Sequence, residues 1–592
     1  MREYATAPNF TIGDDDAIVR TVYRHAQQTP DLVLFSRPDG DVWVDVTAAE
    51  FADLVTGVAK GLIQGGVQSG DRVILMSSTR FEWTLLDFAI WAVGAVSVPV
   101  YDSSSADQVR WIVDDSGANV AIVEKASQVG SFESTGVRVL QIDDAAIDTL
   151  LASGTNLDDA AVEQRMSALR ADDLASLVYT SGTTGRPKGC ELTHRNFLSE
   201  VRGILAASIG EVAQPGNRML TFLPLAHVLA RAVSLAMFEA GGAQAHWSDF
   251  GTIVGQFGRY RPNVILGVPR VFEKVRDAAA QQASAGGAFK KRVFDFAEAT
   301  AVSYSEALDS GRLSITLRVK HFVADKLVYS KLRSVLGGEC WWAISGGGAL
   351  MPRLGHFFRG VGVPVYEGYG LTESTAAHCV NVPGAQRIGS VGQPLGGNAV
   401  RIAADGEIEL SGGVVFGGYW KNDAATEAVL DGPWFRTGDL GSLDEDGYLT
   451  ITGRKKDLLI TAGGKNVSPG PLEDLMRSHE LVSQAVVVGD GKPFIGALVT
   501  VDPDAFTRWR AANGKDADAT VSELRGDADL RAAIQAVIDD ANRLVSHAEA
   551  IKKFEILDHD LTEENGALTA TLKIKRNVVS ERYRDEIDAL YG

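Results

Sequence analysis

The sequence predicts an α/β protein in which a large N-terminal domain is followed by a smaller α+β domain. Short apolar runs alternate with helical patterns through the middle of the 592-residue chain, as they do in α/β proteins. From about residue 454 the order changes, and two neighbouring strand patterns come before the helices. The 62 glycines are about a tenth of the chain, above the ~7% norm, which indicates many tight loops able to hold ligands.

Glycine-bearing loops follow the strands that we predict for the large domain. Those strands are Leu174–Tyr179, Val264–Leu266, Trp341–Ile344 and Val363–Tyr366. Thr193 has the position of an N-cap, before a helix whose apolar face is made by Phe197, Leu198, Val201, Ile204 and Leu205. In open α/β sheets ligands bind beyond the carboxyl ends of the strands, so we expect a site where these loops gather.

The smaller domain has its own sequence of elements. We predict two paired strands, a helix and a further strand, at Gln484–Gly489, Phe494–Val501, Asp527–Val545 and Phe554–Leu557, and a turn at Asn565-Gly566. No proline- or serine-rich linker separates the domains, so we place the boundary by a motif, Gly453–Asp457. The predicted domains are 1–453 and 454–592.

Composition and charge exclude several classes of protein. The formal net charge is −19, which disfavours nucleic acid as a partner. Three isolated cysteines, Cys190, Cys340 and Cys379, form neither a zinc motif nor a disulfide framework. The longest apolar stretch, Phe88–Val100, is shorter than the ~20 residues of a membrane span, and the first residues lack the apolar core of a signal peptide. We therefore expect a cytoplasmic protein.

The strongest motif is Tyr179-Thr-Ser-Gly-Thr-Thr-Gly-Arg-Pro-Lys-Gly189. Glycines let the backbone approach an anion, and hydroxyls and a lysine add donors and positive charge. The motif is not a Walker A loop, because GxxxxGK[ST] does not occur. A flexible surface turn is the alternative, which the trailing Pro-Lys-Gly disfavours. The predicted phosphate-binding residues are Thr180, Ser181, Gly182, Thr183, Thr184, Gly185 and Lys188.

This loop and four later motifs resemble the adenylate-forming enzymes, a superfamily that includes acyl-CoA synthetases, luciferases and peptide-synthetase adenylation domains. The later motifs are Tyr369–Ser374, Trp434–Gly441, Gly453–Asp457 and Leu572–Arg576, in the order and spacing of that superfamily. The resemblance covers nearly the whole chain. It implies a large N-terminal α/β domain of several subdomains and a small C-terminal domain that moves.

The resemblance implies a site for ATP and Mg²⁺. Glu373 would hold Mg²⁺ with Thr180 as a second oxygen, since this cation prefers carboxylate and phosphate oxygens. Asp439 would accept both ribose hydroxyls, and Arg454 resembles a second ribose contact. Gly346, Gly347 and Glu367-Gly368-Tyr369 resemble the walls of an adenine pocket, in which Tyr369 stacks on the base. The expected ATP-binding residues also include Gly370, Thr372 and Lys573.

Lys573 is the expected main catalytic residue, with Glu373 and Thr180 assisting. An ionised fatty acid needs no general base, because its pKa is near ~4–5; it needs positioning and relief of charge repulsion. An exposed lysine beside Lys575 and Arg576 is the alternative interpretation. For the second step, the resemblance places a hinge at Lys456 and a CoA-facing loop at Gly463 and Gly464, whose glycines would admit the pantetheine arm.

The segment Phe222–Arg231 is expected to face the acyl group. It holds no acidic residue to pair with an amino-acid ammonium group, and it is similar to the matching segment of long-chain fatty acyl-CoA synthetases. Its His227, together with Gly267 and Gly348, is assigned to acyl binding, although a histidine among apolar neighbours is as often a core residue. The expected substrates are a long-chain fatty acid, ATP and CoA. Two alternatives stay open: a fatty acyl-AMP ligase that loads a carrier protein, and a non-catalytic lipid- or nucleotide-binding relative.

Residues 286–333 form a basic segment in an acidic chain, with nine Lys or Arg against five Asp or Glu. Lys290-Lys-Arg292 and the aromatic residues Phe289, Phe294 and Phe296 suggest peripheral contact with the inner face of the membrane. The alternative, which the sequence favours just as much, is that these residues form the solvent-exposed face of a helix. The expected assembly is a homodimer.

Overall fold

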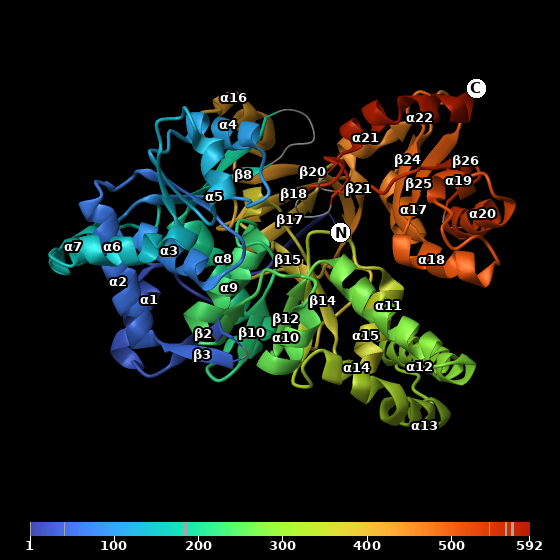
Figure 1. The fold of residues 1–592 in the computed structure, drawn as a ribbon, viewed down its shortest axis with the longest axis horizontal. Coiled ribbons are helices and arrows are strands. Elements are labelled where there is room, and N and C mark those ends of the chain that lie inside the picture. Colours follow the sequence, from blue (N-terminus) through green and yellow to red (C-terminus); the bar gives the residue numbers. More distant parts are fainter. Residues whose placement is uncertain (1, 41, 181–185, 544, 563–564, 570–572) are drawn as a thin grey trace. The chain divides into compact units, whose positions relative to one another are not determined.

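The computed structural model describes the chain except residues 1, 41, 181–185, 544, 563–564 and 570–572 (Figure 1). The chain divides into two compact units. The N-terminal unit contains Met1–Arg401, Glu409–Thr437 and Leu443–Leu449. The C-terminal unit contains Ile402–Ile408, Gly438–Ser442 and Thr450–Gly592. The chain thus crosses between the units several times before it stays in the second.

Among the described residues, the largest sheet of the N-terminal unit has nine strands, some parallel and some antiparallel. Its order is β16-β15-β14-β13-β12-β10-β11-β2-β3. In that order the strands are Gln393–Pro394, Cys379–Val380, Val365–Tyr369, Trp342–Ser345, Val264–Gly267, Arg218–Thr221, Ala243–His246, Val33–Asp39 and Val42–Thr47. Neighbours from β14 to β2 are parallel, so the chain returns between them through helices. The carboxyl ends of these parallel strands therefore lie along one edge of the sheet, which is the edge where we predict the ligand site.

A second sheet of the N-terminal unit has the order β7-β6-β4-β5-β8-β9. These strands are Arg138–Gln141, Val120–Val123, Arg72–Met76, Val96–Val100, Leu174–Thr180 and Lys188–Thr193. Among the described residues of this sheet, only the pairing of β8 with β9 is antiparallel. A buried apolar cluster with α4 (Ala106–Ser116) covers one face, so the fold confirms the predicted α/β class.

Helix α8 (His194–Ala206) begins at the predicted cap. The Thr193 hydroxyl accepts a hydrogen bond from the Asn196 amide at 3.1 Å, and the Asn196 side chain accepts one from the Thr193 amide at 2.9 Å. This reciprocal capping box satisfies two amides that a helix start leaves unpaired. The apolar face that follows is buried, including Phe197, Leu198 and Val201.

A buried ion pair joins α3 (Phe81–Ala92) to α9 (Val228–Ala240). Arg231 donates from Nε and Nη2 to the two oxygens of Asp87 at 2.8 and 2.7 Å, and from Nη1 to Ser176 at 2.8 Å. The guanidinium also lies 4.9 Å from the ring centres of Trp91 and Phe197. Arg231, the last residue of the segment predicted to face the acyl group, therefore lies in the core.

The basic segment 286–333 is helical. It contains α12 (Ala288–Asp309), α13 (Ile315–Ala324), a π-helical turn at Asp325–Tyr329 and the start of α14 (Ser330–Val335). The prediction of a membrane-facing role is wrong for Phe294, because this residue is buried in the core that α11 (Pro269–Ala285) and α15 (Pro352–Val361) also line. Phe289 and Phe296 are exposed, as a surface role requires.

The C-terminal unit contains a three-stranded sheet with the order β24-β25-β26, formed by Val482–Val488, Ile495–Val501 and Ile551–Ile556. The first pair is antiparallel and the second parallel. The sheet packs on α17 (Pro469–Arg477), α18 (Pro503–Ala512) and α20 (Ala528–Asn542), with α21 (Arg576–Arg582) and α22 (Arg584–Tyr591) at the end of the chain (Figure 1). The predicted strands, helix and α+β character are all present here.

Candidate active site

The two ends of the predicted phosphate loop are held close together. Thr180 ends β8 and pairs directly with Lys188, which begins β9. On the Lys188 side, the Trp111 indole donates to the Pro187 carbonyl at 2.9 Å, and the Arg186 guanidinium lies 4.5 Å from the Trp111 ring centre. The predicted residues Ser181, Gly182, Thr183, Thr184 and Gly185 lie outside the described residues.

Glu373 lies in a 3₁₀ turn, Thr372–Ser374, just beyond β14. The Tyr419 hydroxyl donates to Glu373 Oε1 at 2.8 Å, and the ammonium of Lys188 lies 4.4 Å from the Tyr419 ring centre. Burial and the neighbouring Glu373 carboxylate raise the pKa of the Tyr419 hydroxyl, so Tyr419 stays a proton donor to Glu373. The predicted residues Lys188 and Glu373 therefore meet around one aromatic side chain.

The backbone after Glu373 is held in an unusual conformation. Thr375 has a φ of 63°, a region that threonine rarely adopts. Its hydroxyl donates to the Val414 carbonyl at 2.6 Å, and the Ala377 amide donates to the buried Glu200 carboxyl at 2.8 Å. These contacts fix the turn that carries Glu373.

Two residues of this site were missed by sequence reasoning. Tyr419 is far from Glu373 in the chain, and its only local signal is an aromatic residue after Gly417-Gly418. Cys190, on β9, has no sequence signal beyond its isolation from other cysteines. It is fully buried, and burial together with the Glu373 charge raises the pKa of its thiol. Cys190 is therefore a neutral packing residue beneath the site.

The glycines predicted for the adenine pocket lie at the carboxyl ends of β13 and β14. A Cβ on Gly346 would lie 3.0 Å from Leu229, and one on Gly370 would lie 1.6 Å from the Ala376 carbonyl oxygen. Gly347 has a φ of 76°, which favours glycine. The same edge holds the other predicted members of this set, Glu367, Gly368, Tyr369 and Thr372.

Glu367 is buried, and its Oε1 accepts a hydrogen bond from the Leu350 amide at 2.9 Å. Burial raises the pKa of this carboxyl to about 7. A group with such a pKa changes charge near neutral pH. This property was not apparent from the sequence, which assigned Glu367 only to a pocket wall.

The predicted acyl residues occupy separate loops of the same unit. His227 is the N-cap residue of α9 and accepts a hydrogen bond from the Leu229 amide on Nδ1 at 3.2 Å. Gly267 ends β12, and a Cβ there would lie 3.1 Å from the Phe272 ring. Gly348, in the loop after β13, has more space, since a Cβ at this position would lie 3.6 Å from Pro269. The structure gives His227 a helix-capping contact besides any contact with a ligand.

Asp439 and Arg454 form an ion pair in the C-terminal unit. Arg454 Nε lies 2.8 Å from Asp439 Oδ1; Asp439 is on β20 (Trp434–Leu443) and Arg454 ends β21 (Leu449–Arg454). Asp439 is buried and Arg454 is partly exposed. The two residues that the resemblance assigns to the ribose thus contact each other directly.

Lys573 is exposed in the C-terminal unit, and its backbone is hydrogen-bonded to Thr569. Its amide donates to the Thr569 hydroxyl at 3.0 Å, and its carbonyl accepts from the Thr569 amide at 2.8 Å. The predicted hinge residue Lys456 is exposed in a 3₁₀ turn, Lys455–Asp457. Gly463 and Gly464 form the turn between β22 (Leu459–Ile460) and β23 (Asn466–Val467), where Gly464 has a φ of 76°.

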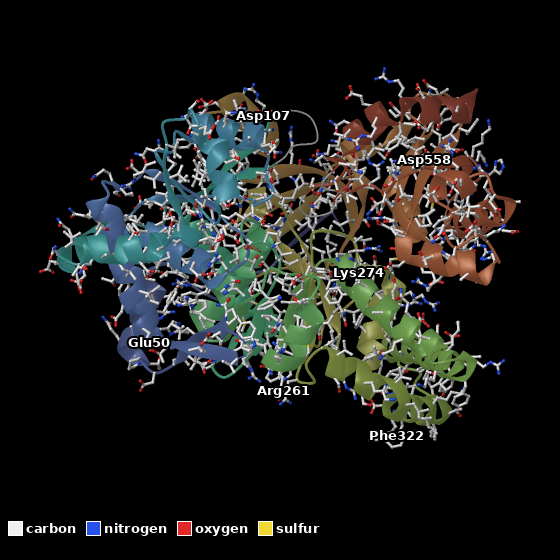
Figure 2. All side chains as sticks on the ribbon, viewed as in Figure 1. Glu50, Asp107, Arg261, Lys274, Phe322 and Asp558 are labelled. Carbon is white, nitrogen blue, oxygen red and sulfur yellow. The ribbon has the colours of Figure 1, made fainter. Side chains whose placement is uncertain are left out.

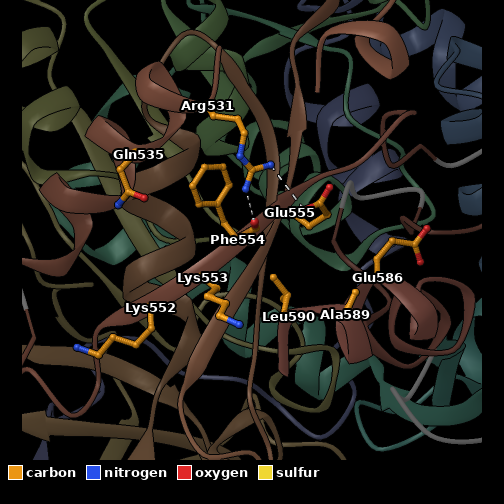
Figure 3. Close-up of a pocket in the computed structure, with 9 residues that line it drawn as sticks. All are labelled: Arg531, Gln535, Lys552, Lys553, Phe554, Glu555, Glu586, Ala589 and Leu590. Atoms are coloured by element: carbon orange, nitrogen blue, oxygen red, sulfur yellow. Dashed lines mark hydrogen bonds and ion pairs between the residues drawn. The ribbon is translucent and has the colours of Figure 1, made fainter. Parts of the chain in front are cut away.

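Two cavities lie away from all of these residues. One, of about 300 Å³ in the C-terminal unit, is lined by β26, α20 and α22, including Arg531, Lys553 and Glu586 (Figure 3). The other, of about 500 Å³, is lined by Val33, Arg218 and Ala243, the first residues of β2, β10 and β11. It therefore opens at the sheet edge opposite the glycine loops after β13 and β14.

The described residues contain no group of three or more His, Cys, Asp or Glu side chains able to hold a metal ion. Mg²⁺, however, commonly needs only one or two carboxylates when substrate phosphates supply the other oxygens. Glu373, whose carboxylate is oriented by Tyr419, fits that requirement. In the part of the chain that the structure describes, no helix is long and apolar enough to cross a membrane.

Solved structures define the class to which this fold belongs. The adenylation domain of a carboxylate reductase from Mycobacterium chelonae superposes with a TM-score of 0.75 at 20% identity, covering 97% of this chain and 91% of that one. An O-succinylbenzoate coenzyme A synthetase from Bacillus subtilis in complex with AMP gives 0.67 at 21% identity, covering 94% and 97%. The fold is that of the adenylate-forming enzymes.

The family follows from the sequence comparisons. A family model described as AMP-binding enzyme matches residues 22–420, and one described as AMP-binding enzyme C-terminal domain matches residues 456–592. The chain belongs to the AMP-binding enzyme family. It is 50% identical to "Long-chain-fatty-acid--CoA ligase FadD15" of Mycobacterium bovis, over 100% of both chains. It is 30% identical to "Long-chain-fatty-acid--CoA ligase ACSBG1" of Rattus norvegicus, over 93% of this chain and 82% of that one.

Proposed function

We propose that this protein is a long-chain fatty acid–CoA ligase that uses ATP and Mg²⁺ and acts through an acyl-adenylate. The observation that carries the proposal is the 50% identity, over the whole of both chains, to a relative named as such a ligase. The alternatives are a fatty acyl-AMP ligase that loads a carrier protein and a non-catalytic relative. The full-length match to a CoA ligase favours neither of them.

In the first step, a carboxylate oxygen of the fatty acid attacks the α-phosphorus of ATP. The new acyl–oxygen–phosphorus bond forms as the bond to the β-phosphate bridge breaks, and pyrophosphate leaves. Lys573 is assigned to orient the carboxylate and neutralise charge on the α-phosphate, which relieves repulsion between two anions. Glu373 and Thr180 would hold Mg²⁺, which supplies charge neutralisation at the phosphates.

The remaining nucleotide contacts are assigned to both units. Lys188 and the hydroxyls and glycines of the loop from Thr180 to Gly185 would bind the phosphates. The loops that contain Gly346, Gly347 and Glu367 to Thr372 would enclose adenine. Asp439 would accept the ribose hydroxyls, and its ion pair with Arg454 would hold the two proposed ribose contacts side by side.

In the second step, the CoA sulfur attacks the acyl carbon, the acyl–oxygen bond to AMP breaks, and the thiol proton is released to solvent or a base. We propose that domain 454–592 rotates about Lys456 relative to domain 1–453 between the steps. The rotation would exchange Lys573 for the turn at Gly463 and Gly464. His227, Gly267 and Gly348 are assigned to the acyl group near its carboxylate.

The test separates the two half-reactions. With ATP, Mg²⁺ and acids from short to very long, we expect acid-dependent pyrophosphate exchange, and acyl-CoA only after CoA is added. Lys573→Ala should abolish the exchange but spare thioester formation from supplied acyl-adenylate, whereas the neighbouring control Lys575→Ala should retain both. Transfer to a carrier protein but not to CoA would favour the first alternative, and ATP binding without turnover the second.

We also propose a location and an assembly. Contact with the inner face of the membrane through residues 286–333 would place a cytoplasmic enzyme where long-chain acids partition. The proposed assembly is a homodimer, which light scattering of the purified full-length chain would test; a monomer at micromolar concentration would contradict it.

A further inference from the structure

Helix α13 has an apolar face exposed to solvent. The exposed side chains are Ile315 (81% exposed), Val319, Phe322 (63%) and Val323, followed by Leu327 in the π-helical turn. They recur three or four residues apart, so they lie along one side of the helix. Figure 2 shows Phe322 at the outer edge of this group of helices. Because soluble proteins rarely expose large continuous apolar patches, this face indicates a binding surface.

The opposite side of α13 is firmly packed. His321 Nε2 hydrogen-bonds the Gly360 carbonyl of α15 at 2.7 Å, and its ring stacks on Tyr304 of α12 at 3.8 Å between ring centres. Ala324 is buried, and Ser314 caps the helix start by accepting from the Leu317 amide at 3.2 Å. The helix is thus fixed with its apolar face outward.

Positive charge flanks the apolar face. Exposed cations on and around α13 are Arg312, Arg318, Lys320, Lys326 and Lys331. The only acidic residue between positions 310 and 334 is Asp325, and Arg333 neutralises it at 2.7 Å. The rest of the chain is strongly acidic, so this surface is a local exception to the net charge of −19. This face therefore favours a partner of negative charge, whereas a two-fold dimer through the same face would bring its positive charges together.

We propose that the α13 face docks on an anionic lipid bilayer. Ile315, Val319 and Phe322 would enter the boundary between headgroups and acyl chains, while flanking arginine and lysine side chains reach the phosphates. An anionic bilayer matches both the apolar side chains and the flanking cations, since it offers an apolar layer directly below a negative surface. The inference rests on the proposed function for its purpose, because a long-chain acid is concentrated in such a bilayer. Within residues 286–333, the membrane contact is thus placed on α13 and not on the Lys290-Lys-Arg292 segment.

The experiment measures binding of the full-length protein to vesicles by co-sedimentation. Vesicles of phosphatidylglycerol with phosphatidylcholine, and of phosphatidylcholine alone, provide the anionic and neutral surfaces. We expect Ile315→Ser with Phe322→Ser to weaken binding to the anionic vesicles by at least about tenfold. Arg318→Glu with Lys320→Glu should weaken it by a similar factor and remove most of its salt dependence. Val254→Ser, at an exposed apolar residue of α10 (Ile253–Tyr260), is the matched control and should bind as the wild type does.

The same variants are assayed for acyl-CoA formation without vesicles, where we expect unchanged rates because α13 holds no residue assigned to the chemistry. Unchanged vesicle binding in the Ile315/Phe322 variant would overturn the proposal. So would a dimeric wild type that this variant converts to a monomer without loss of vesicle binding, because a second copy would then cover the face. Vesicle binding without any ligase activity would leave the docking surface intact and reject the proposed function instead.

Discussion

The buried carboxylate of Glu473 forms an ion pair with the partly buried Arg576 in the C-terminal unit, and Arg576 is three residues from the lysine proposed to catalyse adenylation. The Glu473 carboxylate accepts from Arg576 Nη2 and, at 2.6 Å, from the Val487 amide. Arg576 begins α21, three residues after Lys573, and its Nε lies 4.0 Å from Asp457, next to the proposed hinge residue. One guanidinium thus connects the Lys573 segment, the hinge turn and α17.

Replacing Arg576 should loosen these connections. Arg576→Met leaves the buried Glu473 carboxylate without its cation, which should cost less than the ~3–5 kcal/mol of a fully buried pair, because the Arg576 side chain is partly exposed. We expect a lower unfolding temperature, faster proteolysis of the C-terminal unit and slower pyrophosphate exchange. Arg584→Met, on an exposed arginine of α22, is the matched control. Equal behaviour of the two variants would show that the pair does not hold this segment.

The hydrogen bond from Tyr419 to Glu373 should affect nucleotide binding. Tyr419→Phe keeps the ring near Lys188 but removes a hydrogen bond to a carboxylate, a bond worth about 1.5–3 kcal/mol. If Glu373 holds Mg²⁺, the Mg-ATP concentration required for half-maximal pyrophosphate exchange should rise about tenfold, with a smaller loss of maximal rate. Tyr448→Phe, which loses a bond to the Ala385 carbonyl, should leave both values near the wild type. A change in maximal rate alone would contradict the assigned role.

Local patterns predicted much of the fold because their causes are local. The Thr193 cap, the strand that ends at Thr180 and the paired strands of the C-terminal unit depend on neighbouring residues and on apolar periodicity. Gly346 and Gly370 were also predicted from local sequence. The structure gives the reason for glycine at both positions, because a Cβ there would meet neighbouring atoms.

Contacts between distant segments could not be predicted in this way. The Tyr419–Glu373 bond joins residues 46 positions apart, and the Asp87–Arg231 pair joins residues 144 positions apart. The burial of Phe294 shows the same limit: its helix has one buried and one exposed side, and only packing against neighbouring helices decides which side it occupies. The apolar face of α13 was missed because an exposed and a buried apolar stripe have the same sequence pattern.

The Asp87–Arg231 pair should be much more important for stability than a surface pair of similar geometry. Both partners are fully buried, so Arg231→Met should lower the free energy of unfolding by about 3–5 kcal/mol, measured with urea. Arg195→Met breaks a two-bond contact with the exposed Asp172 and should cost less than about 1 kcal/mol. Asp87→Leu with Arg231→Met should recover part of the loss, since no buried charge then lacks a partner. If Asp87→Leu with Arg231→Met were less stable than Arg231→Met alone, the cost would not come from an unpaired buried charge.

Glu367 should make the stability of the N-terminal unit depend on pH near neutrality. Burial raises the pKa of its carboxyl from 4.5 to about 7, so the folded state holds a proton that the unfolded state releases between these values. The stabilisation from this proton is therefore complete below pH 4.5 and is lost as the pH rises toward 7, by an amount on the order of 3 kcal/mol. Glu367→Gln stays neutral and can still accept from the Leu350 amide.

Urea unfolding of the wild type and Glu367→Gln from pH 5 to 8.5 would measure this effect. We expect the difference in free energy of unfolding to grow in favour of the variant up to about pH 7 and then to level off, because above its pKa the folded carboxyl is ionised as well. Glu200→Gln is the comparison, since burial raises the pKa of that carboxyl to about 8 and its difference should keep growing to a higher pH. If the free energies of unfolding of Glu367→Gln and the wild type differed by the same amount at every pH, Glu367 would already be ionised in the folded protein over this range.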